Sequence, residues 1–414
     1  MKNINVYDIL KYSIIVFPLA FAGIPIYLHA PDYYASNLGI KIETIGLALL
    51  VLRLFDAFLD PLIGRISDYF FYIRHKIIYF GSFLLALGFW MVFHPYGSYI
   101  LAWFFLSIFL CTLGFSLIAI NIQAFGGLWD ISSRQVIKVI TIREAISLLG
   151  LLTASIMPTI LYLYFKENNF HILSMILILI ILISLIFFDK WFKLSSIKKP
   201  KSKSVSISFF YIFKNNIVKL FFISYFFSTF AASIPATIII FYVRDYLLAE
   251  QFLGLFLLVY FLSGALSMPI WKHISVQYGI KNAWLFSMIF ALFTFIWAFF
   301  LQPNHILGFF VICFLSGIAV GANLSLPSMI VAEFIKLNKH ENLAASYYSI
   351  SNFLSKFSLA IASGIALPIL GFMGYQPGII RDDYLFPFTY ALLPCIFQVI
   401  SIFVLYWFII KKTD

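Results

Sequence analysis

Twelve apolar stretches of at least 18 residues each account for most of this 414-residue chain. They fall near residues 10–37, 43–67, 75–95, 98–127, 135–164, 170–192, 217–244, 251–275, 282–301, 305–335, 343–371 and 385–410. About 20 such residues let an α-helix cross the hydrocarbon core of a bilayer. Charged residues make up only 11% of the chain, against about 25% in a soluble domain. We therefore expect an integral membrane protein whose apolar excess faces lipid.

Basic residues are unevenly distributed among the connecting segments, and this asymmetry predicts the orientation. With the N-terminus inside, the outer loops hold only Lys41, Lys166, Arg244 and Arg381, while the inner segments hold most other lysines and arginines. The net charge of +11 then reflects cytoplasmic loops rather than a nucleic-acid partner. Abundant Ile, Lys and Phe are typical of an AT-rich bacterial genome. We expect a multi-pass protein of a bacterial inner membrane, with both termini cytoplasmic and with the lipid bilayer, a small-molecule solute and a coupling cation as partners.

A basic, serine-rich break near the middle of the chain predicts two halves. The segment KLSSIKKPKSKSVSIS, residues 193–208, is read as a cytoplasmic linker that is solvated or contacts anionic lipid. The expected fold is all-α, with twelve transmembrane helices in two six-helix bundles, 1–192 and 209–414. A weak repeat that aligns Pro61 with Pro269 agrees with parallel halves, the arrangement of many secondary transporters.

Three ionisable residues lie close together in the middle of the second apolar stretch. Arg53, Asp56 and Asp60 share one helix face at 100° per residue, and the two aspartates are one turn apart. Two carboxylates so close in a low dielectric cannot both ionise cheaply, so they must take up a proton or a cation such as Na⁺. The alternative is that Arg53 merely neutralises one aspartate, which leaves the second unexplained. We predict a cation-coupling site.

Five other polar residues inside the stretches are candidates for binding a solute. Arg143, which precedes Glu144, offers a bidentate donor or an ion pair to an aspartate of the second stretch. Asn121 and Gln123, followed by Gly126 and Gly127, either bind a polar ligand or hold helices together. Lys356 and Asn352 lie on one polar stripe, and a buried lysine requires a partner across a cavity.

Motifs of soluble chemistry are absent from the sequence. It contains no phosphate-binding loop of the G-x-x-x-x-G-K-[ST] type and no H-E-x-x-H pair. The three cysteines, Cys111, Cys313 and Cys395, lie within apolar stretches and are read as packing residues. We therefore expect no enzyme activity, no bound metal, no cofactor beyond a coupling H⁺ or Na⁺, and a monomer.

The segment RLFDAFLDPLIGRISD, residues 53–68, resembles the second-helix motif of the glycoside–pentoside–hexuronide:cation symporters. These belong to the major facilitator superfamily and include melibiose permease. YYASNLGI before it, and MIVAEFIKLNKHENLAASYYSISNFLSKFSLA with LGFMGYQPG near the end, are similar to further blocks of that family. The resemblance covers scattered blocks between about residues 30 and 378.

This resemblance implies roles for individual residues. Asp56 and Asp60 would be the cation-site carboxylates with Arg53 beside them, and Arg143 and Lys356 would face the solute. Asn121 stands where the family has an aspartate shared by the sugar and cation sites.

The sequence also departs from the family pattern. Leu59 replaces a Na⁺-binding asparagine, and Ala20 replaces a sugar-binding aspartate. With fewer oxygens for Na⁺, these departures favour H⁺. With both sugar-binding acids lost, they also favour a sugar acid over a neutral galactoside.

The resulting prediction is a secondary active transporter that carries a small polar solute, a sugar or sugar acid, by cation symport and alternating access. Two alternatives of the same fold remain: an uncoupled uniporter or exchanger, and a carrier of lysolipids or other amphiphiles. A membrane enzyme is disfavoured because the sequence offers neither a nucleophile–base set nor metal ligands at an interface.

Overall fold

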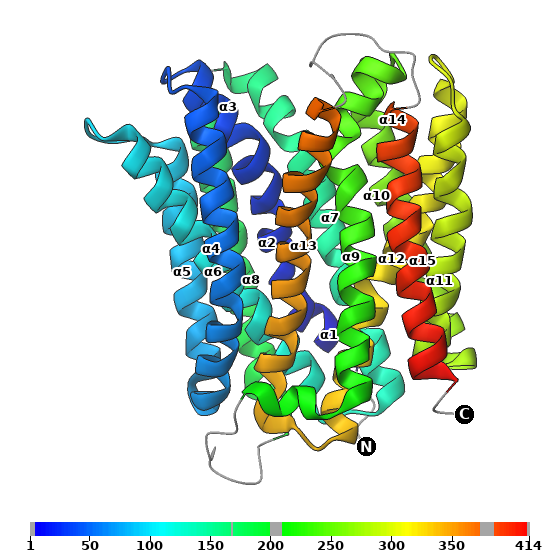
Figure 1. Ribbon diagram of the computed structural model, residues 1–414. Coiled ribbons are helices and arrows are strands. Elements are labelled where there is room, and N and C mark those ends of the chain that lie inside the picture. The colour runs from blue at the N-terminus through cyan, green and yellow to red at the C-terminus, as the bar shows by residue number, and fades with distance from the viewer. Residues whose placement is uncertain (1–4, 167–168, 199–208, 373–384, 412–414) are drawn as a thin grey trace. The chain divides into compact units, whose positions relative to one another are not determined.

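The computed structural model describes residues 5–166, 169–198, 209–372 and 385–411 (Figure 1). These residues are almost entirely helical, and the described chain contains no β-strand beyond one isolated antiparallel bridge between Trp129 and Ile197. The predicted all-α class is confirmed.

The chain forms two compact units. Met1–Phe209 and Val331–Ile350 form the first, and Phe210–Ile330 and Ser351–Asp414 form the second. The first unit thus contains a segment from the second half of the sequence. The predicted division into bundles 1–192 and 209–414 stays a prediction.

The first unit begins with a broken helix. α1 and α2 meet near Ile14, and a π-helical turn, η1, starts at Pro25, whose ring removes a backbone N–H from the ladder. α7 begins with a capping box, in which Ser132 and Gln135 satisfy each other's backbone N–H groups. The helices of the first unit that precede the basic segment are α1 (Val6–Ser13), α2 (Val16–Ile24), η1 (Pro25–His29), α3 (Ala30–Ser36), α4 (Ile42–Tyr69), η2 (Phe71–Ile73), α5 (Arg74–Phe93), α6 (Ile100–Leu128), α7 (Ser133–Phe165) and α8 (Asn169–Leu194).

The remaining helices follow the basic segment. They are η4 (Phe209–Lys214), α9 (Asn216–Phe241), η5 (Tyr242–Tyr246), η6 (Glu250–Phe252), α10 (Leu253–Tyr278), α11 (Ile280–Phe295), η7 (Ile296–Phe300), α12 (Ile306–Leu337), η8 (Glu341–Leu343), α13 (Ala344–Phe372), α14 (Leu385–Pro387), η9 (Phe388–Leu392), α15 (Leu393–Leu405) and η10 (Tyr406–Ile410). The end of α12, all of η8 and the first two turns of α13 belong to the first unit. In the second unit, Ser224 and Ser401 join α9 to α15 through hydroxyl groups 3.0 Å apart.

Each of the twelve predicted stretches is helical, but not all are apolar enough to count as spans by composition. Within the described residues, nine helices pass a test of length and apolarity, or ten if the bent pair of α1 with α2–α3 is one span. α4 does not pass because it carries Arg53, Asp56, Asp60, Arg65 and Asp68. α13 is not among the nine helices within the described residues, and Lys356 is its one charged residue. The prediction of an apolar span was thus too generous for α4, whose charges are costly in lipid.

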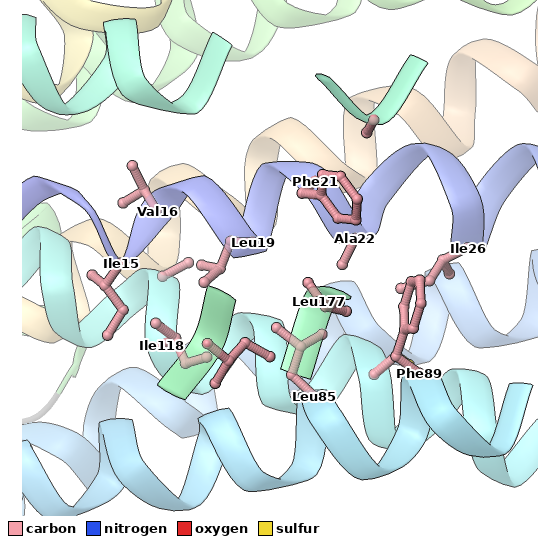
Figure 2. Close-up of a cluster of buried hydrophobic side chains, with 14 of the residues drawn as sticks. Ile15, Val16, Leu19, Phe21, Ala22, Ile26, Leu85, Phe89, Ile118 and Leu177 are labelled. Atoms are coloured by element: carbon pink, nitrogen blue, oxygen red, sulfur yellow. The ribbon is translucent and has the colours of Figure 1, made fainter. Parts of the chain in front are cut away.

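The core of the first unit is apolar and closely packed. Figure 2 shows side chains from α2, α5, α6 and α8 meeting there, among them Leu19, Leu85, Ile118 and Leu177. α5 and α6 lie side by side (Figure 1), and glycines allow this approach. A Cβ on Gly88 would lie 2.8 Å from the carbonyl oxygen of Ser107 and 2.9 Å from the sulfur of Cys111. All three cysteines are buried free thiols, which agrees with their interpretation as packing residues.

Candidate functional site

The two aspartates of α4 lie on its buried face. Asp56 is 5% exposed and Asp60 is fully buried, while Phe55 and Phe58 on the opposite face are more than half exposed. The predicted sharing of one face is therefore correct for the carboxylates. The hydroxyl of Ser116, fully buried on α6, donates to Oδ1 of Asp56 over 3.1 Å. This hydroxyl brings the carboxylate of α4 and the middle of α6 together.

Arg53 lies on the same helix but contacts a different element. Its guanidinium is 5.0 Å from the centre of the Tyr27 ring, within the π-helical turn η1. Such a cation–π contact favours a cation where full hydration is lost. The turn at Pro25 thus helps to position Arg53, the basic side chain that is nearest to the two aspartates in the sequence.

The two amides of α6 differ in their surroundings. Asn121 is fully buried, donates to the carbonyl of Leu117 over 2.6 Å, and accepts a hydrogen bond from Ser67 of α4. Both ends of its amide are thus engaged in packing, which favours the helix-joining alternative for this residue. The Oε1 of Gln123 is buried and has no hydrogen-bond partner in the described part of the chain. Gln123 therefore has the acceptor that remains open to a ligand.

Arg143 is buried beside a pair of glycines on α6. Its Nε lies 3.0 Å from Oε1 of Glu144, and a second guanidinium nitrogen also contacts this carboxylate. A Cβ on Gly126 would meet the hydroxyl of Tyr12 and would lie 3.7 Å from Nη1 of Arg143. A Cβ on Gly127 would lie 3.0 Å from the Tyr348 hydroxyl. The glycines open α6 to these side chains.

Arg143 and Asn121 lie at different heights along α6. Ser116, Asn121 and Gly126 follow one another at five-residue intervals on α6, which is about 7.5 Å per step along the axis. Arg143 therefore lies about 7.5 Å along α6 from Asn121. Tyr12, Ser116 and Tyr348 were missed by sequence reasoning, since they come from helices remote in sequence. The adjacent glycines were the signal that could have indicated a close approach.

A further charged cluster lies at the end of α4. Asp68 pairs with Arg74 over 2.7 Å and accepts hydrogen bonds from the backbone N–H groups of Ala345 and Ser346, over 2.9 and 2.8 Å. A carboxylate is stabilised at this helix start because unsatisfied N–H groups point toward it. Arg65, in contrast, is exposed.

Lys356 and Asn352 are half-buried on the part of α13 that belongs to the second unit. Nearby on this helix, Ser358 and Thr229 of α9 lie with their hydroxyl oxygens 2.9 Å apart. The other predicted site residues all belong to the first unit. Among the residues that the structure describes, no group of three or more His, Cys, Asp or Glu side chains is placed to hold a metal ion.

Comparison with known proteins places these features in a family. Residues 13–412 match the family model described as MFS/sugar transport protein. The chain belongs to this family. It is a multi-pass membrane transporter of the major facilitator superfamily and not an enzyme, as its resemblance to the cation symporters implied.

A curated relative matches part of this MFS transporter. The sodium-dependent lysophosphatidylcholine symporter 1 of Xenopus tropicalis is 30% identical over 154 residues, which cover 35% of this chain. The match spans only 29% of the length of that relative.

Solved structures show the fold of this MFS transporter over nearly its whole length. A bacterial homologue of the iron transporter ferroportin, in an outward-facing state, aligns with a TM-score of 0.75 and 15% identity, covering 97% of this chain and 99% of that one. The fucose:proton symporter of E. coli aligns with a TM-score of 0.71 and 14% identity, covering 97% and 98%. The expected major facilitator fold is confirmed.

Proposed function

We propose that this transporter couples the movement of a small polar solute to a cation held by Asp56 and Asp60. The observation that carries the proposal is the burial of two carboxylates one turn apart on α4. At a separation of one helical turn, two negative charges repel strongly in a low dielectric. Binding a proton or a metal cation relieves this repulsion, so the aspartate pair favours the uptake of one positive charge.

We favour H⁺ as the coupling ion. Leu59, between the aspartates, adds no oxygen, and the hydroxyl of Ser116 already donates to Asp56. A hard metal cation requires several oxygen ligands, whereas a proton requires one carboxylate oxygen. The Na⁺ alternative is supported by the name of the Xenopus relative, which is a sodium-dependent symporter.

The proposed solute is a sugar or a sugar acid such as a hexuronate. The family description supports a sugar. Arg143, Lys356 and Asn352 supply donors for hydroxyl or carboxylate groups, although Glu144 already offsets the charge of Arg143. Oε1 of Gln123 supplies an acceptor for a hydroxyl group. Lys356 then contributes the charge that attracts an anionic solute.

Coupling in this scheme is reciprocal. The cation neutralises the α4 pair, solute binding becomes more favourable, and the loaded carrier changes its access from one side of the membrane to the other. Each ligand must therefore bind more tightly when the other is present.

A second candidate is an amphiphile carrier. The partial match to a lysophosphatidylcholine symporter is the observation that favours it. An uncoupled uniporter or exchanger is the third reading, and it would leave the buried aspartate pair with a structural role only.

Purified protein in proteoliposomes would separate these possibilities. We would record proton movement with a panel of neutral sugars, hexuronates and lysophosphatidylcholine, each with and without Na⁺. The variants Asp56→Asn and Asp60→Asn would be compared with Asp130→Asn, whose carboxylate is exposed and lies 4.0 Å from Lys198.

Three outcomes are informative. External alkalinisation with a hexuronate, lost in both α4 variants and kept in Asp130→Asn, would support the proposal. Proton movement with neutral sugars but not with hexuronates would overturn the proposal of an anionic solute. Uptake indifferent to both ions and to both aspartates would overturn coupling.

A further inference from the structure

Two histidines outside the transport residues face each other in the first unit. His94 directly follows α5, and His171 is the third residue of α8. Nε2 of His94 lies 2.8 Å from Nδ1 of His171, and both side chains are half-buried. α5 has 20 residues, so this pair lies about 30 Å along it from the Asp68–Arg74 cluster.

The orientation of His94 is set by Trp90. Nδ1 of His94 lies 2.8 Å from the carbonyl oxygen of Trp90, and the two rings stack with centroids 3.9 Å apart and planes inclined by 7°. A carbonyl oxygen only accepts hydrogen bonds, so Nδ1 carries the proton and Nε2 presents its lone pair. Histidines that ligate metals have this arrangement, with the other ring nitrogen donating to a carbonyl or carboxylate.

The spacing of the two nitrogens indicates which coordination geometry they fit. Two ligands about 2.0–2.1 Å from a metal ion lie about 2.8–3.0 Å apart at a right angle, and about 3.3–3.4 Å apart at the tetrahedral angle. In the metal-free pair the 2.8 Å separation is that of a hydrogen bond. A right-angled site would therefore need almost no movement of the two rings, whereas a tetrahedral site would need them to move apart by about 0.5 Å. Right-angled sites with nitrogen ligands are typical of Cu²⁺ and Ni²⁺, whereas Zn²⁺ prefers tetrahedral sites.

We propose that His94 and His171 form a binding site for a divalent transition-metal ion, with Cu²⁺ and Ni²⁺ preferred over Zn²⁺. In the metal-free pair, Nδ1–H of His171 donates to Nε2 of His94. On binding, that proton moves to Nε2 of His171, so that both facing nitrogens offer lone pairs to the ion. Water fills the remaining positions, because the described residues provide no third His, Cys, Asp or Glu ligand. The ion joins α5 to α8 and stabilises the first unit.

The test uses full-length protein without a histidine tag, purified in detergent. Cu²⁺ is added and its electron paramagnetic resonance spectrum recorded, and melting temperatures are measured with NiCl₂, ZnCl₂ and MgCl₂. The variants are His94→Gln and His171→Gln, with His305→Gln, an exposed histidine between η7 and α12, as the matched control.

We expect coupling of Cu²⁺ to two nitrogens in the wild type and in His305→Gln. NiCl₂ should raise the melting temperature by a few degrees. Losing one ligand in His171→Gln should weaken Ni²⁺ binding by at least about tenfold.

Several results would overturn the site. An unchanged spectrum in His171→Gln would assign the copper to other groups. A wild-type spectrum that shows Cu²⁺ coupled to one nitrogen or to none would also overturn the site, even if the variants failed to fold. A larger thermal shift with ZnCl₂ than with NiCl₂ would overturn the right-angled geometry.

Discussion

Asp68 on α4 accepts two hydrogen bonds from Ser346 in the first turn of α13, from the backbone N–H over 2.8 Å and from the hydroxyl over 2.6 Å. Its other partners are Arg74 and the N–H of Ala345. Asp68 and Arg74 are both almost completely buried. One buried carboxylate thus holds the start of α5 and the first turn of α13 against the end of α4.

Replacing Asp68 with Asn should strongly destabilise the protein. The change leaves the Arg74 guanidinium buried without its counter-charge, which typically costs about 3–5 kcal/mol. Melting in detergent, followed by tryptophan fluorescence, measures the loss. The control is Asp130→Asn, which removes an exposed pair worth about 1 kcal/mol or less. Equal melting temperatures for the two variants would contradict the role given to Asp68.

Gly64 tests the same contact sterically. A Cβ at this position would overlap the side chain of Ser349 and lie 3.0 Å from the carbonyl oxygen of Ala345. Gly64→Ala should therefore destabilise by about 1–3 kcal/mol through overpacking. Gly46→Ala on the same helix meets nothing within 4 Å and should be neutral or stabilising by up to about 1 kcal/mol.

A second substitution, at Ser349, should restore the stability lost in Gly64→Ala. Ser349→Gly removes the atoms that a Cβ on Gly64 would meet, so the double variant should recover most of the melting temperature lost by Gly64→Ala. If the two effects simply add, the overlap between α4 and α13 is not the cause.

The helices and the face of the carboxylates could be predicted from sequence because both follow from local rules. Apolar length indicates a span, and 100° per residue places Asp56 and Asp60 together. The charges that keep α4 from passing as an apolar span were visible in the sequence, where Arg53, Asp56 and Asp60 indicated a functional helix rather than one that faces lipid.

The partners of the predicted residues could not be predicted, because periodicity within a helix does not identify its neighbours. Ser116 is 60 residues from Asp56, and Tyr348 is more than 200 from the Arg143 and Gly127 region. For Asn121 the sequence left solute binding and helix joining open, and only its contact with Ser67 shows that its amide joins α4 to α6. Contacts of this kind depend on which helices pack together.

Acidification should destabilise the protein through His340, which lies between α12 and α13. Burial lowers the pKa of His340, and the neighbouring Glu341 only partly offsets this. The unfolded chain, with an ordinary histidine pKa of about 6.5, then binds the proton more readily than the folded one. Stability is therefore lost as pH falls through and below about 6.5, at no more than about 1.4 kcal/mol per pH unit for this group.

Melting temperatures at pH 7.5 and 5.5 check this prediction. The drop between the two pH values should be smaller in His340→Gln than in the wild type. His305→Gln, which changes an exposed histidine, should keep the full drop. Identical drops in all three proteins would assign the acid sensitivity to other groups.

Ser116 can distinguish the two candidate coupling ions. Its hydroxyl donates to Asp56, and a hydrogen bond to a charged group is worth about 1.5–3 kcal/mol. For a proton-coupled carrier, Ser116→Ala removes a competitor for the carboxylate, so the pH of half-maximal uptake should rise by about one to two units. For a Na⁺-coupled carrier, the same variant removes an oxygen ligand, so the Na⁺ concentration for half-maximal uptake should rise instead.

Uptake in proteoliposomes, measured over a pH series and a Na⁺ series, gives both midpoints. The control is Ser184→Ala, which changes a buried serine that is hydrogen-bonded within α8. If neither midpoint moves relative to that control, Asp56 does not hold the coupling ion.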